Sequence, residues 1–532
     1  MVAFINKNHD YFLKKNETRD FINLGDKEKI SQEECIRLIK AITDSNYAYI
    51  TSLKDDDLTK VSWNGEVLSE LIPEKDSKIH KIYEKFETLW FASATQGIPL
   101  RESVKAAYIV SEQIQTLAQN GKTIELEKFI ASISYRAYVE LCNFYKLPEN
   151  GTEVIFDDNA TLVFYQFLGM LNIPERSHLV TSIDIGQTLR KTLSGEKEEK
   201  TIFGFKPAVD IWENNKAIPN KVKTLGPLHA HLINTFSNLG YQTDLDFIND
   251  LKKIMKSYNP KVFLIPTVTS TGRKLPFIES CNLIKFLSDK MNYKSLIILD
   301  DAQGLYRLNP QEYWNEGENS IWNYADAILT NGAKIAGGLT GTGVMLMNRK
   351  KLHEWEKPFS ENLFNFRSRR YNFISSDRSR VKAYNLNSPN LANFPELSSL
   401  SIALQHFDFS LSIQNKMNEV QAFVRKYLSG IPGIKVLNAK KNKNYCVNSI
   451  ITFYFKKFPK KSDIFRRLLM TPTGKNFPED LPITLPKIIS TENIDYLRIS
   501  LDPRRIIDPY YIELLKYSLK RIKKNCKLIE NL

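Results

Sequence analysis

Short apolar runs that end in polar residues are the strongest pattern in this chain. Leu296–Leu299 is followed by Asp-Asp-Ala-Gln, and Ala327–Leu329 is followed by Thr-Asn-Gly-Ala-Lys. A third run, Gly343–Met347, comes after several glycines. Uninterrupted runs of this length, rich in Ile and Leu, are typical of strands buried on both faces of a sheet. Polar groups collect at the carboxyl ends of such strands, so we expect an acid, an amide and a lysine to meet at one edge.

Further strands and helices alternate upstream of these runs. The pattern predicts strands at Val154–Phe156, His178–Ile183 and Lys261–Pro266. Helical periodicity predicts helices at Glu102–Asn120, Ile124–Tyr145, Leu162–Leu171, Leu228–Leu239, Leu245–Ser257 (with Asp244 as candidate N-cap) and Pro276–Met291. Strands that alternate with helices indicate an α/β fold with a mostly parallel sheet between helices.

The pattern divides the chain into three regions. Residues 1–87 are polar with helical patterning and are expected to form an N-terminal extension. Residues 88–395 form the large α/β domain, with an insertion at about 188–224 that is rich in Lys, Glu, Gly and Pro. Residues 396–532 begin with a long helix, Leu397 to about Ser429. Strands at Val447–Phe455 and Tyr496–Leu501, each followed by a helix, then predict a smaller α+β domain.

Composition restricts the class of protein. The 532 residues are 42% hydrophobic and 25% charged, as in ordinary soluble globular proteins. No apolar run is long enough to span a membrane, and the N-terminus lacks the apolar core of a signal peptide. The five cysteines are scattered without paired or metal-type spacing. We therefore expect a cytoplasmic protein that has neither a membrane-spanning segment nor a metal site.

The net charge of +14 raises the question of a nucleic-acid partner. The basic residues are spread along the chain, and the densest cluster, Lys516–Lys527, has Ile and Leu at helical spacing. That spacing indicates the solvated face of a terminal helix. The sequence therefore predicts against nucleic-acid binding.

Two of the strand ends suggest a cofactor. Asp300 follows a buried strand, which favours a functional carboxylate over a helix cap or turn residue, although Asp301 could compete for the role. Lys334 follows the next strand, whereas Lys350 and Lys351 come after another strand and are expected on a solvated face. A buried carboxylate and a single lysine suit a cofactor that has a ring nitrogen and an aldehyde, and pyridoxal 5′-phosphate (PLP) has both.

A strand–turn–helix upstream offers an anion site. The turn Asp157–Thr161 joins the strand at Val154–Phe156 to the helix at Leu162–Leu171, so backbone N–H groups and the helix dipole point at it. Asn159 and Thr161 could add side-chain hydrogen bonds. Plain N-capping by Asp158 or Asn159 is the alternative.

Seven motifs occur in an order that resembles the class V aminotransferase family. That family is the branch of fold-type I PLP enzymes that also holds cysteine desulfurases and kynureninases. The motifs are Ser93–Pro99 (SATQGIP), Ile155–Thr161 (IFDDNAT), Thr269–Gly272 (TSTG), Asp300–Gln303 (DDAQ), Lys334, Ser388–Asn390 (SPN) and Arg498–Ser500 (RIS). The resemblance covers about residues 88–525 and implies a fold-type I PLP-transferase fold, with a mostly parallel sheet of seven strands between helices.

The resemblance implies a role for each site residue. Asp300 would pair with the pyridine nitrogen, Gln303 would hydrogen-bond the phenolic oxygen, and Lys334 would form the Schiff base and then act as general acid and base. The other cofactor-binding residues that it implies are Asn159, Ala160 and Thr161 around the phosphate, with Asn331 assisting, and Thr269.

Two further implied residues concern the substrate and a second subunit. Arg498 would clamp the α-carboxylate of an amino-acid substrate, although a surface arginine at a strand edge is the alternative. Ser388 would reach the phosphate of the facing subunit, which implies a homodimer with shared active sites.

The chain departs from the family at three places. Asp184 and Ile185 stand where relatives have Glu-His, whose histidine stacks on the cofactor ring, and His229 is the candidate replacement. Ala333 stands where a histidine commonly precedes the lysine. Met470–Ser490 contains no cysteine, which argues against cysteine desulfuration through a persulfide.

The sequence thus predicts a PLP-dependent enzyme that acts on an amino acid. Transamination is the first expectation, because it needs no further catalytic group. β-Elimination or C–S bond cleavage is the alternative reaction. A non-catalytic binding or regulatory protein with this fold is the alternative from another class.

Overall fold

The structure is a computed structural model, and it describes most of the chain between residues 99 and 503. The described residues are 89–90, 99–157, 159–174, 177–185, 229–237, 240–313, 320–334, 338–339, 341–355, 372–374, 394–406, 411–437, 449–457, 459, 483–484, 487–490, 494–503 and scattered positions from 506 to 526. The extension expected at 1–87, the insertion expected at 188–224, and Ser388 lie outside these residues.

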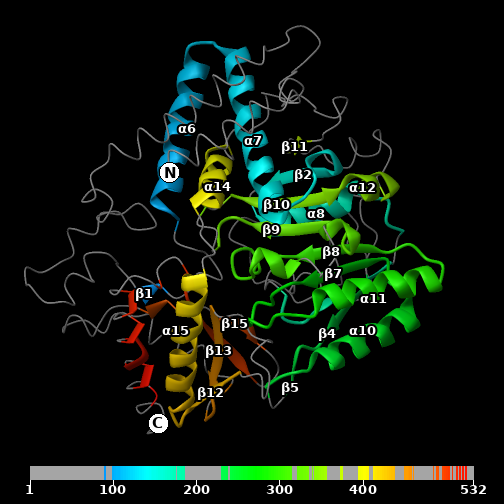
Figure 1. Cartoon of the computed structure of the whole chain (residues 1–532), viewed down its shortest axis with the longest axis vertical. Coiled ribbons are helices and arrows are strands. Elements are labelled where there is room, and N and C mark those ends of the chain that lie inside the picture. Colours follow the sequence, from blue (N-terminus) through cyan, green and yellow to red (C-terminus); the bar gives the residue numbers. More distant parts are fainter. Residues whose placement is uncertain are drawn as a thin grey trace, which may run out of the picture.

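A large sheet forms the centre of the molecule (Figure 1). Its strands, in spatial order, are β11 (Asn372–Ile374), β2 (Thr152–Asp157), β10 (Gly343–Asn348), β9 (Ala327–Asn331), β8 (Leu296–Asp300), β7 (Val262–Pro266), β3 (His178–Ser182) and β4 (His229–Ile233). The strands from β9 to β4 are parallel, and β10 is antiparallel to both of its neighbours. The expected mostly parallel sheet is confirmed, and β11 is an eighth strand beyond the seven expected.

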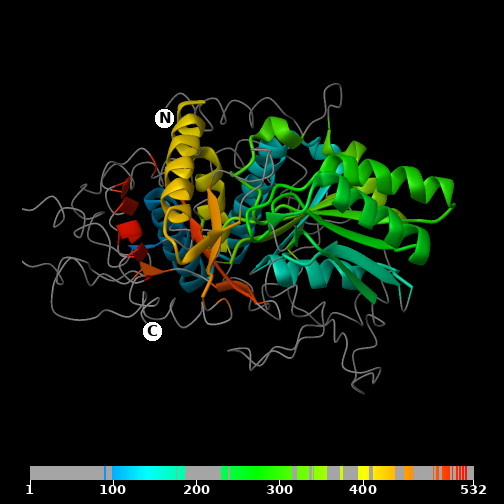
Figure 2. The same ribbon diagram turned by 90° about the horizontal axis from the view of Figure 1, so that it is seen from below.

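Helices cover both faces of this sheet (Figure 2). Alternate residues of each strand point to opposite faces, and the apolar side chains on both faces are buried beneath these helices. Ile298 of β8 packs in the hydrophobic cluster that includes α8 (Ala160–Met170) and α12 (Arg349–Trp355). Its neighbours Ile297 and Leu299 pack in the cluster on the other face. That cluster includes α7 (Thr123–Tyr145), α10 (Asp244–Tyr258) and α11 (Phe277–Lys290). The strands are therefore apolar throughout, as the sequence pattern indicates.

A second, antiparallel sheet forms its own core. Its strands, in order, are β12 (Ile434–Val436), β13 (Ile450–Phe455), β16 (Asp495–Ser500) and β15 (Lys487–Ser490), and α15 (Leu411–Ser429) packs against it. The single long helix expected from Leu397 is wrong. Instead, α14 (Phe394–His406) packs on α6 (Arg101–Gln119) and α7, beside the large sheet. The two helices contribute to two separate cores.

The helix expected at Leu228–Leu239 is also wrong. His229–Ile233 is strand β4, which pairs in parallel with β3, and β5 (Phe236–Ser237) pairs with β6 (Gly240–Tyr241). Apolar residues in this short stretch fit both periods, and pairing along the exposed edge of β3 decides for a strand. Gly240 has φ 132°, a conformation that favours glycine, and it is the first residue of β6, paired with Ser237.

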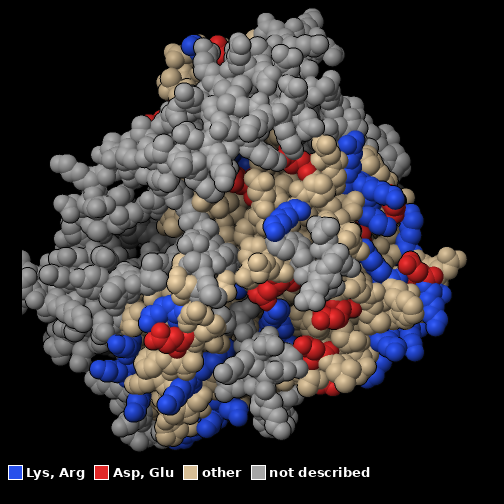
Figure 3. All heavy atoms as spheres, viewed as in Figure 1, with Lys and Arg blue, Asp and Glu red and all other residues tan. Residues whose placement is uncertain are grey.

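Shorter elements complete the description. They are β1 (Leu89–Trp90), which pairs with β14 (Ile483–Thr484), and the 3₁₀ turns Glu149–Gly151, Pro310–Tyr313 and Ile321–Asn323. No helix among the described residues is long and apolar enough to cross a membrane. On the face drawn in Figure 3, Lys and Arg side chains border the side of α10, α11 and α12, with acidic side chains among them.

Candidate active site

The carboxyl ends of the parallel strands bring the predicted acid and lysine to one edge of the large sheet. Asp300 ends β8 and pairs with Pro266 of β7 and Leu329 of β9. Lys334 follows β9 by three residues. The charge of each group shifts the pKa of the other, so the two side chains lie close together. The expectation that these strand ends meet is confirmed.

Asp300 is a buried carboxylate with acceptor capacity to spare. Its side chain is 6% exposed, and Oδ1 accepts a hydrogen bond from the backbone N–H of Ala302 at 3.0 Å. No other hydrogen bond links the Asp300 carboxyl to the described residues. Burial raises the pKa of Asp300, and the nearby Lys334 ammonium and the Ala302 N–H lower it. A cationic N–H donor placed beside this carboxylate would favour its charged form.

The backbone of its turn holds Lys334 in place. Asn331 Oδ1 accepts a hydrogen bond from the N–H of Ala333 at 2.7 Å, and Gly332 donates to the carbonyl of Thr342 at 3.0 Å. Burial lowers the pKa of Lys334 to about 8, with Asp300 acting in the opposite direction. The amine is therefore neutral in a substantial fraction of molecules near physiological pH. Asn331, expected to touch a phosphate, uses Oδ1 to position the lysine.

Asp301, the rival of Asp300, has a structural role. Its carboxylate accepts hydrogen bonds from the hydroxyls of Tyr145 (2.6 Å), Tyr313 (2.8 Å) and Thr267. Burial raises its pKa to about 7, while the hydroxyls of Thr267, Tyr145 and Tyr313 lower it. Three donors from separate segments hold this carboxyl inside the protein, whereas Asp300 accepts one hydrogen bond from the described residues. The sequence could not show this, because Tyr145 is 156 residues away.

The start of α8 lies at the same edge of the sheet. Gly343 at the start of β10 pairs with both Asp157 and Asn331, so the turn before α8 and the turn before Lys334 flank β10. A Cβ at Gly343 would collide with the backbone of Asn159 and Ala160, so only glycine lets the two segments approach this closely. Asn159 is exposed, and its carbonyl accepts the Val163 N–H at 3.1 Å as α8 begins.

These three residues therefore offer an anion site. The first backbone N–H groups of α8 have no partners within the helix, and the helix dipole adds partial positive charge there. Ala160 is 8% exposed and Thr161 is half-buried. The expected position of Asn159, Ala160 and Thr161 at the carboxyl edge of the sheet fits the geometry.

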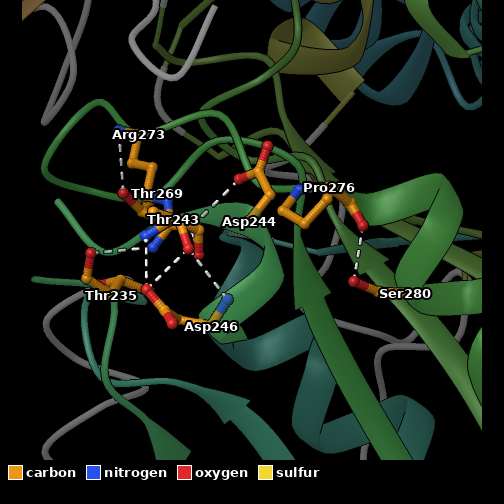
Figure 4. A network of polar contacts seen from close by, with 8 residues as sticks. All are labelled: Thr235, Thr243, Asp244, Asp246, Thr269, Arg273, Pro276 and Ser280. Atoms are coloured by element: carbon orange, nitrogen blue, oxygen red, sulfur yellow. Dashed lines mark hydrogen bonds and ion pairs between the residues drawn. The ribbon is translucent and has the colours of Figure 1, made fainter. Parts of the chain in front are cut away.

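Hydrogen bonds within the turn after β7 involve Thr269. The Thr269 hydroxyl contacts the Thr271 hydroxyl at 2.9 Å and accepts the N–H of Arg273 at 3.1 Å. The buried Arg273 guanidinium donates to the carbonyls of Thr235 (2.9 Å) and Thr243 (3.1 Å) and pairs with Asp244 (Figure 4). Thr269, expected to bind the cofactor, thus has hydrogen bonds inside the turn.

Figure 4 also shows how α10 begins beside this turn. Thr243 and Asp246 form a reciprocal capping box, so the N-cap is Thr243 and the expected Asp244 is wrong. The Thr243 side chain caps the helix while its carbonyl accepts Arg273, which ties α10 to the turn.

The position of the expected ring-stacking histidine holds an apolar side chain. Asp184 is buried, its carbonyl accepts Ser270, and Oδ2 accepts the Thr271 hydroxyl at 2.5 Å. Ile185 is 1% exposed and packs in the same cluster as Ala160 and Ala302. Ile185 follows the carboxyl end of β3, which is parallel to β7 and β8, so it lies along the same edge of the sheet as Asp300.

His229, expected as a replacement for that histidine, does not belong to this group. It pairs with His178 at the amino end of β3. The carboxyl end of the same strand pair, where Ser182 meets Ile233, leads to the site. The reason is the wrong helix noted above: His229 begins the five-residue strand β4, and Ile233 at the other end of that strand lies at the site edge.

Arg498 reaches this site from β16 of the second sheet. It is 4% exposed, and Nη1 donates to the carbonyl of Ser270 at 2.7 Å. Burial lowers its pKa to about 9, and its charge contributes to the lowered pKa of Lys334. The alternative of a surface arginine at a strand edge is wrong, because the side chain is buried and faces the large sheet.

Sequence reasoning missed Arg307, the other arginine that acts on Lys334. Its Nη1 donates to the Ser449 hydroxyl at 2.6 Å, just before β13. Its neighbours Leu305, Tyr306 and Leu308 are all buried. The available signal was a single basic residue within an apolar run directly after the Asp-x-Ala-Gln motif. Gln303 of that motif is 7% exposed.

Comparison with solved structures shows the fold. A cysteine desulfurase from Thermococcus onnurineus is 12% identical, with 87% of this chain and 100% of that chain covered and a TM-score of 0.54. The cysteine desulfurase CsdA from Escherichia coli is 11% identical (83% and 95% covered, TM-score 0.52). The cystine C–S lyase C-DES with its product cysteine persulfide is 13% identical (81% and 97% covered, TM-score 0.51).

No protein-family model matches the sequence, and no curated protein matches it. At these identities the structural likeness establishes the architecture. The chain has the fold of fold-type I PLP enzymes, and this expectation from the sequence is confirmed.

Proposed function

We propose that this protein is a PLP-dependent enzyme that acts on an amino acid. The observation that carries the proposal is the pair formed by Asp300 and Lys334 at one sheet edge. One is a buried carboxylate with a single hydrogen bond from the described residues, and the other is a lysine whose pKa is lowered to about 8. C-DES, which shares the fold, holds PLP in its solved structure.

The residues present fit this cofactor. Asp300 would hold the proton on the ring nitrogen, because a charge-assisted hydrogen bond favours the carboxylate that burial alone disfavours. The neutral fraction of Lys334 would bond covalently to the aldehyde carbon. The backbone N–H groups at the start of α8, in Ala160 and Thr161, would bind the phosphate. Ile185 would contact the ring through apolar surface, in place of a histidine.

Bound PLP supplies a ring that withdraws electrons from the substrate Cα. The protein supplies positioning and proton transfer. Arg498 would bind the α-carboxylate, and its bond to the Ser270 carbonyl fixes the guanidinium direction. Lys334 would take the Cα proton, since a base with a pKa of about 8 suits operation near neutral pH.

Transamination is the reaction that we propose first, since it requires proton transfer at two carbons and no group beyond Lys334. C–S bond cleavage is the second candidate, favoured by the fold shared with the cystine C–S lyase C-DES. The described cysteines, Cys142, Cys281 and Cys526, are all buried and none lies in a site segment, so a persulfide on these three does not enter the proposal.

The proposal includes a homodimer. Ser388 is outside the described residues, and its role toward a facing subunit stays a prediction from the resemblance.

The test is a visible absorption spectrum of protein mixed with PLP. We expect a band from the covalent linkage in the wild type, and its loss in Lys334→Ala. Lys350→Ala, on the exposed side of α12, is the matched control and keeps the band. Assays for keto acid, ammonia and sulfide with an amino-acid panel then separate transamination from C–S cleavage. A wild type without the band would contradict the enzyme proposal.

A further inference from the structure

Arg307 lies where a charged side chain is strongly disfavoured. It lies in the turn after Gln303. In this turn the Gly304 carbonyl accepts hydrogen bonds from the backbone N–H of Arg307 at 2.7 Å and of Leu308 at 3.0 Å. From this turn its side chain extends to Ser449 at the start of β13. The guanidinium thus lies between the two sheets, on the side from which Arg498 also enters.

The Arg307 guanidinium has buried donors that nothing in the described residues satisfies. A guanidinium carries five N–H donors. Nη1 donates to Ser449, whereas Nε and Nη2 are buried and have no hydrogen-bond partner. No acidic side chain among the described residues forms an ion pair with it. Buried donors of a charged group are normally satisfied, so these two atoms point to a ligand that supplies acceptors.

The charges around Arg307 indicate what kind of ligand this is. Burial lowers its pKa, the charge of Arg498 lowers it further, and Asp502 raises it. Both arginines also lower the pKa of Lys334. Two guanidinium groups and an amine therefore share one buried region and repel one another. A ligand with a single carboxylate would neutralise the charge of one of these guanidinium groups and leave the other without a counter-charge.

We propose that the substrate is an acidic amino acid, with Arg498 binding its α-carboxylate and Arg307 binding the anionic group of its side chain. That group is a carboxylate or an equivalent oxyanion such as a sulfinate. The inference rests on the proposed function for the α-carboxylate and adds the class of substrate. The planar fork of each arginine matches one oxyanion with two parallel hydrogen bonds.

The cofactor phosphate is the other anion to consider for Arg307. The start of α8 follows β2, and β2 is separated from β8, which precedes Arg307, by β10 and β9. Arg307 instead contacts the second sheet through Ser449, as Arg498 does through β16. The geometry thus places Arg307 on the substrate side.

The test is calorimetric titration of the PLP-loaded protein with succinate and with butyrate. Both have four carbons and lack an amino group, so binding is read without turnover, and the bound cofactor already occupies the phosphate site. We expect succinate to bind at least about 30-fold more tightly, the size of one charge-assisted hydrogen-bonding contact. Arg307→Gln should reduce this preference to about threefold or less and leave butyrate affinity nearly unchanged.

Two variants complete the design. Arg307→Lys keeps the charge without the fork and should retain part of the preference. Arg349→Gln removes a charge from α12, where Arg349 Nε lies 3.7 Å from Glu153 Oε1. This variant should retain the whole preference for succinate. Equal affinities for succinate and butyrate in the wild type overturn the proposal, whether or not Arg307→Gln folds. A preference that survives Arg307→Gln, or disappears in Arg349→Gln, overturns it as well.

The absorption band separates this inference from the proposed function. A band without succinate preference overturns the acidic substrate alone. If no band forms, the proposed function fails, and titration of the unloaded protein with the same variants still decides whether the two arginines bind a dicarboxylate.

Discussion

At the scale of single residues, Lys334 connects the sequence motif to the proposed chemistry. Its pKa is lowered to about 8, mainly by burial. The carboxylates of Asp300 and Asp301 raise this pKa, and the charges of Arg498 and Arg307 lower it further. For a lysine with a lowered pKa, the neutral amine is populated above about pH 8, whereas an exposed lysine requires a pH near 10.4. The reactivity of the amine therefore reports the electrostatics of the site without cofactor or substrate.

The pH dependence of Lys334 acetylation in unloaded protein tests this directly. We expect acetic anhydride labelling, followed by mass spectrometry of the Lys334 peptide, to reach half its maximal rate near pH 8. Asp300→Asn removes a charge that raises the pKa of Lys334, so its midpoint should be lower. Arg498→Gln removes a charge that lowers this pKa, so its midpoint should be higher. A wild-type midpoint near 10.4 would refute the electrostatic account.

Single residues also show what the sequence could reveal. Asp300 and Lys334 follow apolar strands, so local pattern was enough to find them. Tyr145 and Arg307 were missed because their roles depend on contacts across the fold, with Asp301 and Ser449 respectively. No spacing along the chain encodes such contacts.

At the scale of elements, the turn after β8 keeps Asp301 inward while Asp300 faces the site. Gly304 makes this turn possible. A Cβ there would collide with the side chains of Asp301 and Thr267, which already hydrogen-bond to each other. The turn and the tyrosine hydroxyls around Asp301 are therefore one packed unit.

Replacement of Gly304 tests that packing. We expect Gly304→Ala to lower the free energy of unfolding by about 1–3 kcal/mol, because the added methyl overpacks a buried hydrogen-bonded group. Gly430→Ala is the control. Gly430 is exposed after α15, and the nearest atom to an added Cβ is at 3.4 Å, so its change should be about 0.5 kcal/mol or less. Equal unfolding midpoints in urea for both variants would contradict this role of Gly304.

Sequence patterns predicted most of these elements, with clear exceptions. Runs such as Leu296–Leu299 and Ala327–Leu329 are strands because they are apolar throughout. The stretch from Leu228 to Leu239 fitted a helix, and only the pairing of His229–Ile233 beside β3 makes that part a strand. The antiparallel direction of β10 was also beyond local pattern, since direction depends on neighbouring strands.

At the scale of the whole molecule, three hydrogen bonds place the second sheet against the site. They run from Arg498 to Ser270, from Thr452 to Thr271, and from Arg307 to Ser449. The fold was predictable from the order of weak motifs, because motifs within the described residues, such as Thr269–Gly272 and Asp300–Gln303, lie at the ends of strands of the large sheet. The N-terminal extension, the insertion and Ser388 stay predictions from sequence alone.

The proposed homodimer belongs to this scale. Sedimentation velocity should give the mass of two 61.5-kDa chains at micromolar concentration, because the shared active sites that we propose require both subunits. A monomer that still binds PLP through Lys334 would refute the shared-site part of the account and leave the chemistry of Lys334 and Asp300 in place.

The central claim, that Lys334 carries the cofactor, is tested most directly by trapping the linkage. Protein loaded with PLP is reduced with borohydride, digested and mapped by mass spectrometry. The account predicts one stoichiometric pyridoxyl adduct, on Lys334, and none on Lys350 or Lys351 of α12. An adduct on a different lysine, an adduct spread over many lysines, or unchanged labelling in Lys334→Ala would contradict it.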